Sequence, residues 1–194
     1  MWGKLAAPAD ASGARLTELV HADWECGFVR EVTIDRAHPA TFPQIVEGLA
    51  TLDTTRLLRQ LTIGNSEWTT GMFDALATRS WPHLRALVLA GLDRVDTARV
   101  IALLDDAHTP ALAALDLTSV AFPDSLCRAI ATRPIARRLR SLTLQRCHFG
   151  DDAIQALATA PFEVLEELHL HGRGPGQAAE MLAHVASRVV IEWR

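Results

Sequence analysis

The sequence predicts an α/β solenoid, with a curved parallel β-sheet on the inside and α-helices on the convex side. Three observations predict this fold. A short apolar motif with strand periodicity recurs five times at nearly constant spacing, and apolar residues at helical spacing follow each copy. The chain has 194 residues and is 49% hydrophobic, which is enough for one domain with a buried core.

The predicted strands coincide with the motif apolar-x-x-apolar-x-apolar. Its five copies are separated by steps of 26, 28, 27 and 26 residues and begin at Leu58, Leu84, Leu112, Leu139 and Leu165. The last two apolar positions are two residues apart, so they lie on one face of a strand and their neighbours point to the other face. One such unit cannot bury its own apolar face, so we expect the units to stack and share a core.

Helices are expected between these strands, because each intervening segment has apolar residues three or four positions apart. The helical positions are Met72, Phe73, Leu76; Val100, Leu103, Leu104; Leu126, Ile130; Ile154, Leu157; and Met181, Leu182, Val185. Two helix starts are marked by Pro123-Asp124-Ser125 and by Gly150-Asp151-Asp152.

The two ends carry weaker copies of the motif. One is expected at residues 29–34 and a shortened one at residues 189–191. Leu16–Trp24 is predicted to form an amphipathic helix that caps the first unit, so residues 1–27 are assigned to a lead-in and cap, and 28–194 to the repeat domain. The last strand would form an open edge, which a partner or a second copy of the chain is a candidate to cover.

This pattern resembles the leucine-rich repeat family, in its ribonuclease-inhibitor-like branch, over about five full repeats with degenerate terminal ones. Residues 24–29 are similar to segments that open bacterial members of the family. The family places Asn or Cys three residues after the motif, where the side chain bonds neighbouring loops. The corresponding positions here are Ser66, Leu92, Val120, Cys147 and Arg173. Only Cys147 fits, so irregular turns are expected.

Functional residues are expected among those that alternate with the leucines. The middle of this surface is small and apolar, at Ala86, Val88 and Ala90, whereas its two ends are polar. An apolar centre with a polar rim suits a protein interface, although an unused surface that drifted toward Ala and Thr would look similar. The candidate partner-binding residues are Thr62, Val88, Asp116, Thr143, His169 and His171, together with Trp68 in a rim loop. For Trp68, packing over a neighbouring loop is the alternative.

Composition excludes several classes of protein. The net charge of −4 disfavours a nucleic-acid-binding protein, and no apolar run is long enough for a membrane span. Three cysteines do not make a disulfide scaffold, and the first 13 residues lack the apolar core of a secretory signal, so a cytoplasmic location is expected. A row of arginines occupies the second motif position, directly after the first apolar residue, at Arg30, Arg59, Arg85 and Arg140. It suits an acidic partner or a phosphate group, or a solvated edge paired with nearby acids.

No enzymatic activity, metal or cofactor is expected. His169 and His171 with Asp116 or Glu167 lack a recognised metal-binding motif. Cys147 and His148 are adjacent on an extended segment, where side chains point apart and do not form a catalytic dyad. The glycine-rich residues 172–176 are interpreted as a tight turn.

Two functional hypotheses follow. The first is a non-enzymatic module that binds a protein partner through its concave or rim surface. The alternative is a structural or assembly subunit, or a regulatory inhibitor of a partner enzyme, that makes contact through the convex helices or end caps. The location of exposed apolar residues distinguishes the two hypotheses.

Overall fold

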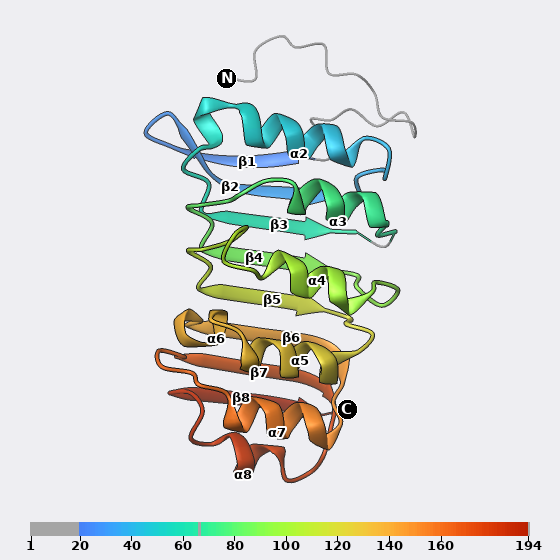
Figure 1. Cartoon of the computed structure of the whole chain (residues 1–194), viewed down its shortest axis with the longest axis vertical. Coiled ribbons are helices and arrows are strands. Elements are labelled where there is room, and N and C mark those ends of the chain that lie inside the picture. The colour runs from blue at the N-terminus through green and yellow to red at the C-terminus, as the bar shows by residue number, and fades with distance from the viewer. Residues whose placement is uncertain (1–19, 66, 194) are drawn as a thin grey trace.

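The computed structural model describes residues 20–65 and 67–193, and its architecture is α/β. Eight strands form one sheet in chain order (Figure 1). They are β1 (Val20–Glu25), β2 (Phe28–Asp35), β3 (Gln60–Gly64), β4 (Ala86–Ala90), β5 (Ala114–Thr118), β6 (Ser141–His148), β7 (Glu167–Arg173) and β8 (Arg188–Trp193). β1 pairs antiparallel with β2, and each later pair of neighbours is parallel.

The connections between the parallel strands carry the helices, which lie in front of the sheet in the view of Figure 1. They are α2 (Phe42–Thr51), α3 (Thr70–Ala77), α4 (Thr97–Leu103), α5 (Pro123–Thr132), α6 (Ile135–Arg138), α7 (Asp151–Thr159) and α8 (Ala178–Leu182), with a 3-10 turn at Asp53–Thr55. Crossovers between parallel strands are right-handed, so strands added in one direction leave their helices on one face of the sheet. No helix of residues 20–65 and 67–193 lies on the opposite face, which we call the helix-free face.

The core lies between the sheet and the helices. The middle apolar residues of the motif form one row across neighbouring strands, and each is at most 3% exposed. This row consists of Val32, Leu61, Leu87, Leu115, Leu142 and Leu168. The strands predicted from the motif are confirmed, including the weaker copies in β2 and β8. The helix starts predicted at Pro123 and Asp151 are also confirmed.

The N-terminal helix predicted over Leu16–Trp24 is wrong for the part that the structure describes. Val20–Glu25 is a strand that pairs with β2, and residues 1–19 lie outside the described residues. Val20 and Ala22 alternate toward the core, whereas Trp24 is 44% exposed. Pairing with the open edge of β2 therefore outweighs the helical spacing of the apolar residues.

After the motif, four of the strands repeat one backbone feature, because the second residue past the motif has a positive φ at Arg36, Gly91, Ser119 and Arg146. The irregular turns expected from the degraded Asn/Cys position are therefore not found at these four strands. Leu92, Val120 and Cys147 fill this position with buried side chains that pack in the core. Polar bonding is instead supplied by Asn65, one residue before the expected position. Its side-chain amide donates to the Ala37 carbonyl at 2.9 Å, and its side-chain oxygen accepts from the Glu67 amide at 3.0 Å.

We predict that Gly172→Ala strongly destabilises the C-terminal part of the fold. Gly172 has φ +154°, and a Cβ atom there would lie 2.0 Å from the Cys147 carbonyl oxygen on the neighbouring strand. The expected loss in the free energy of unfolding is about 2–4 kcal/mol, measured by urea denaturation. Gly176→Ala is the matched control, because nothing lies within 4 Å of its added Cβ. Equal stability of the two variants would contradict this account.

Candidate interaction surface

The helix-free face of the sheet brings six of the seven predicted site residues together. Thr62, Val88, Asp116, Thr143 and His169 are register partners on successive strands, β3 to β7. They form one row, which we call the central row, and each side chain is partly exposed. His171 lies two residues beyond His169 in a parallel row, where its register partner is Gln145.

The apolar centre predicted for this surface is present on adjacent strands. Val88 is flanked by Ala86 and Ala90 on β4, and Ala114 is the register partner of Ala86 on β5. All four residues are partly exposed. Because these side chains are small, another molecule can approach the sheet closely here. The patch can therefore accept an apolar side chain of that molecule with little desolvation cost.

A polar cluster adjoins the apolar centre, formed by Asp116, Gln145 and His169. The Gln145 side-chain amide donates to Oδ2 of Asp116 at 3.3 Å. Burial raises the pKa of the Asp116 carboxyl, while the Gln145 hydrogen bond and the charge of His169 oppose the rise. Nε2 of His169 is buried and has no hydrogen-bond partner among the described residues. A ligand that brings a donor or a cation to Asp116 would offset the desolvation of its charge.

Trp68 stands apart from the other six predicted residues. It lies in the loop between β3 and α3, with its ring 4.8 Å from that of Phe73 and 6.2 Å from that of Phe42, measured between centroids. Its indole N–H donates to the Ala90 carbonyl at 2.8 Å. Trp68 thus joins the rim loop to helices α2 and α3 and to the end of β4, as its packing interpretation predicts.

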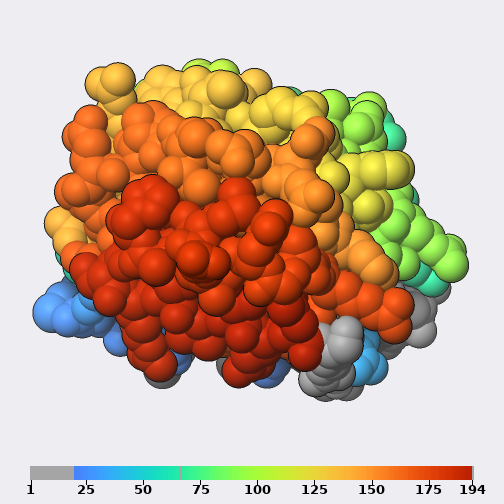
Figure 2. Space-filling model, turned by 90° about the horizontal axis from the view of Figure 1, so that it is seen from below, coloured from blue at the N-terminus to red at the C-terminus, as the bar shows by residue number. Residues whose placement is uncertain are grey.

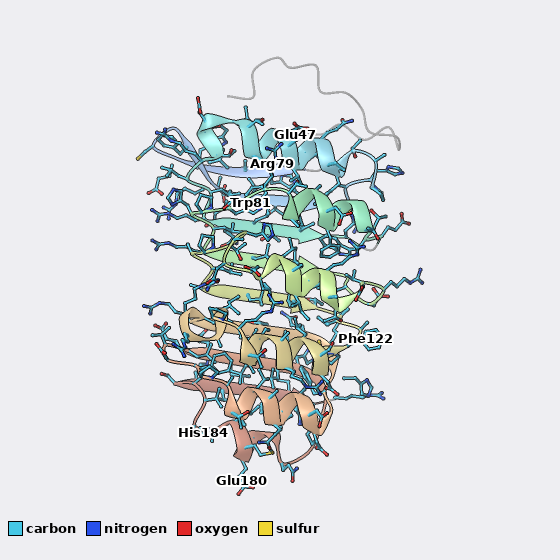
Figure 3. All side chains as sticks on the ribbon, in the orientation of Figure 1. Glu47, Arg79, Trp81, Phe122, Glu180 and His184 are labelled. Carbon is cyan, nitrogen blue, oxygen red and sulfur yellow. The ribbon has the colours of Figure 1, made fainter. Side chains whose placement is uncertain are left out.

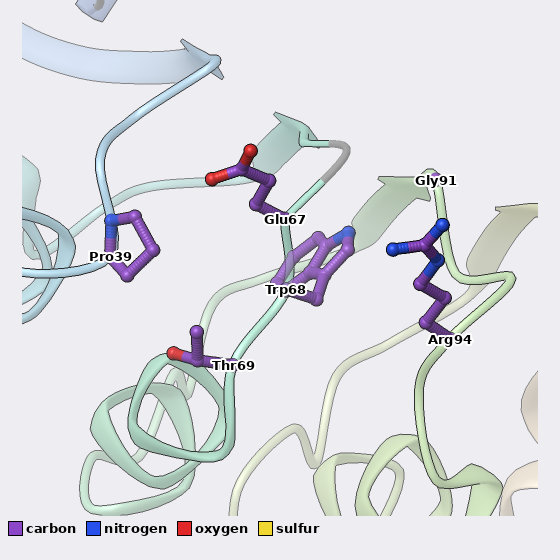
Figure 4. A pocket seen from close by; sticks show the side chains of 6 residues that line it. All are labelled: Pro39, Glu67, Trp68, Thr69, Gly91 and Arg94. Carbon is purple, nitrogen blue, oxygen red and sulfur yellow. The ribbon is translucent and has the colours of Figure 1, made fainter.

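The exposed part of Trp68 lines a shallow hollow of about 270 Å³ at the rim (Figure 4). The other lining residues are Pro39, Glu67, Thr69, Gly91 and Arg94. Glu67 and Arg94 extend on either side of the indole in this view. The hollow therefore offers an aromatic floor between an acid and a base, at the edge of the sheet rather than on the central row.

The arginine row, which lies in β2 at Arg30 and directly before later strands at the other positions, is partly paired. Arg30 contacts Glu25, and Arg140 contacts Glu166. Arg59 and Arg85 form no ion pair with another described residue, but their backbone groups continue the sheet. The Arg59 amide donates to the Arg30 carbonyl at 2.8 Å, and the Arg85 amide to the Arg59 carbonyl at 2.7 Å. These positions therefore have a structural role through the main chain.

The cysteine and histidine pair is not arranged for nucleophilic chemistry. The Cys147 side chain is 3% exposed, its Sγ lies 3.3 Å from the Gln145 carbonyl, and burial raises the pKa of its thiol. The thiol is therefore protonated at neutral pH, and thiolates are the nucleophilic form. Among residues 20–65 and 67–193, no group of three His, Cys, Asp or Glu residues is placed to hold a metal ion.

Comparison with known proteins bears on the fold alone. No family model matches the chain, and no curated protein sequence does. The structure is similar to a crystal structure of a Bacteroides fragilis protein solved by a structural genomics consortium, with a TM-score of 0.61 and 12% sequence identity. The match covers 87% of this chain and 66% of that protein, so this chain spans just under two thirds of its neighbour's length. No helix in the described residues is long and apolar enough to cross a membrane.

Asp116 predicts a pH dependence of stability. Its folded pKa is raised above the ordinary value of 3.8, so it contributes stability below 3.8 that is lost as the pH rises through the folded pKa. Asp116→Asn should therefore gain stability relative to wild type between about pH 3.5 and about pH 7, as measured by urea denaturation. If the stability of Asp116→Asn minus that of the wild type stays constant or falls as the pH rises over this range, the raised pKa of Asp116 is contradicted.

Proposed function

We propose that this chain is a leucine-rich repeat solenoid of the ribonuclease-inhibitor-like type, and that it binds a protein partner through its helix-free face without catalysing a reaction. The in-order parallel strands and the motif spacing of 26 to 28 residues support the solenoid. The helix-free face is the inner surface in such a fold.

The observation that carries the proposal is the central row, where an apolar centre adjoins a desolvated carboxylate. With strands about 4.8 Å apart, the row from Thr62 to His169 extends about 19 Å. A helix about 10–12 Å across, or a loop, fits within that length. We infer that the partner places a small apolar patch over Val88 and Ala114, and a basic or donor side chain on Asp116.

The alternative hypothesis is a structural subunit or regulatory inhibitor that makes contact through the convex helices or end caps. Contact through the helices requires exposed apolar residues on them. Those in the described residues lie instead in β1 and in loops: Trp24, Leu52, Leu57, Phe122 and Val164. Phe122, the most exposed at 65%, precedes α5 at the rim (Figure 3). Neighbouring helical segments carry ion pairs, such as Arg79 with Glu47 and Arg99 with Asp74. These features favour the helix-free face over the helices as the binding surface.

The cysteines support a cytoplasmic location. Cys26, Cys127 and Cys147 are all free thiols, and Cys26 is exposed. An exposed unpaired thiol and two buried ones suit a reducing compartment, where disulfides are rare.

The proposal is tested by Val88→Arg and Asp116→Arg, which place a long cation on the apolar centre and in the polar cluster. We expect each variant to fold, and to bind the partner about 30-fold more weakly or worse, as at an interface hot spot. The partner is first captured by the tagged wild-type protein from its native cells, and dissociation constants are then measured with the purified pair.

Glu47→Arg is the matched control, because it replaces an acidic side chain by arginine on α2, as Asp116→Arg does on the central row. It should leave partner binding unchanged. Unaltered binding by both central-row variants, or loss of binding by the control alone, would refute the proposed surface.

A further inference from the structure

The two ends of the sheet are protected differently. At the N-terminal end, β1 has a register shift between Asp23 and Trp24, and its residues include His21, Asp23 and Glu25. A bulge and charges are the devices that prevent an edge strand from pairing with another chain. β8 pairs with β7 without a register shift, and no described strand lies beyond it. The C-terminal edge strand therefore lacks the bulge of the N-terminal edge strand, although it too carries charged residues, Arg188 and Glu192.

The core is incomplete at this C-terminal end. Val189 and Ile191 continue the leucine rows of β7, yet they are only partly buried, whereas Leu168 and Leu170 are fully buried. Met181 and Val185, in and just after α8, are likewise partly buried against the core. Figure 2 looks onto this end of the molecule, where the C-terminal residues (red) face the viewer. Apolar area therefore remains to be covered beside β8.

The backbone of β8 presents free hydrogen-bonding groups to this space. The Arg188 amide donates to the Glu166 carbonyl at 2.8 Å, so Arg188 directs its backbone groups toward β7. In a parallel pair, alternate residues of a strand bond to the same neighbour. Val190 and Glu192 therefore face β7 as well, and the N–H and C=O groups of Val189 and Ile191 point outward.

The sequence of β8 is complementary to itself. Around Val190, an antiparallel copy places Arg188 opposite Glu192 and Val189 opposite Ile191. Directly opposed residues of antiparallel strands share a face, so both charged pairs would lie on the helix-free face and both apolar pairs on the helix side. The outward N–H and C=O groups of Val189 then face those of Ile191 in the second copy. Each of the two Val189–Ile191 pairs forms two hydrogen bonds, which gives four main-chain hydrogen bonds.

We propose that β8 is the interface of a symmetric homodimer, in which the β8 strands of two copies pair antiparallel about Val190. The pairing joins two eight-stranded sheets into one and brings the two α8 helices together over Val189 and Ile191. A twofold interface of this kind uses the same patch on both copies and closes at the dimer. An interface built from one strand and a short helix is small, so the dimer dissociates on dilution.

Charge exchange across the dimer tests this inference. Sedimentation velocity of the full chain over a wide concentration range should give a monomer–dimer equilibrium. Glu192→Arg, or Arg188→Glu, sets like charges opposite each other twice per dimer, and should raise the dissociation constant about tenfold. The combined variant restores opposite charges, and its dissociation constant should return to within about threefold of the wild-type value.

Two further measurements keep the test specific. Glu47→Arg changes the net charge as Glu192→Arg does, but lies on α2 at the other end of the molecule, and should leave the equilibrium unchanged. Thermal unfolding should give similar melting temperatures for all variants, because Arg188 and Glu192 are exposed and the ion pair that Arg188 forms with Glu167 lies at the surface. The inference is overturned by a wild-type protein that stays monomeric, by an open series of oligomers, or by single reversals that the combined variant does not rescue.

Discussion

The structure depends on one constraint: each strand-and-helix unit can bury its leucines only against its own helix and the neighbouring units. In the interior of the sheet the apolar residues are almost completely buried, since each residue in the row from Val32 to Leu168 is at most 3% exposed. At the ends the same constraint leaves apolar surface uncovered. The N-terminal end is closed by the β1 hairpin, whereas β8 leaves Val189 and Ile191 partly exposed. The proposed dimer supplies the missing neighbour at the second end.

The same constraint separates folding from function on each strand. Residues that face the helices must be apolar and of similar size, because they pack in rows. Residues that face away from the helices are free to vary. The central row can therefore contain side chains as different as Val88, Asp116 and His169. The burial of Asp116 costs stability when its carboxyl is charged, and a donor or cation supplied by the proposed partner would offset this cost.

The sequence was informative wherever the repeat period was strong, and failed where pairing with a neighbour decided the structure. Strand positions and register rows follow from the motif, and two helix starts follow from the residues that begin them, Pro123 and Asp151. Val20–Glu25 satisfies both helical and alternating spacing, and only its contact with β2 makes it a strand. The bonding role of Asn65 was missed because it lies one residue from the family position. Trp68 was placed correctly in a rim loop, but its contacts with Phe42 and Ala90 join segments far apart in the chain.

The most direct test of the central claim is site-specific photo-crosslinking in the complex with the captured partner. A photoreactive residue is placed on the central row at Thr62 or Thr143, and at Arg99 or Arg128 on the helices. The account predicts crosslinks to the partner from the two central-row positions and none from the two helix positions. Crosslinks from the helix positions alone would contradict it, and would identify the helix side of the sheet as the interaction surface.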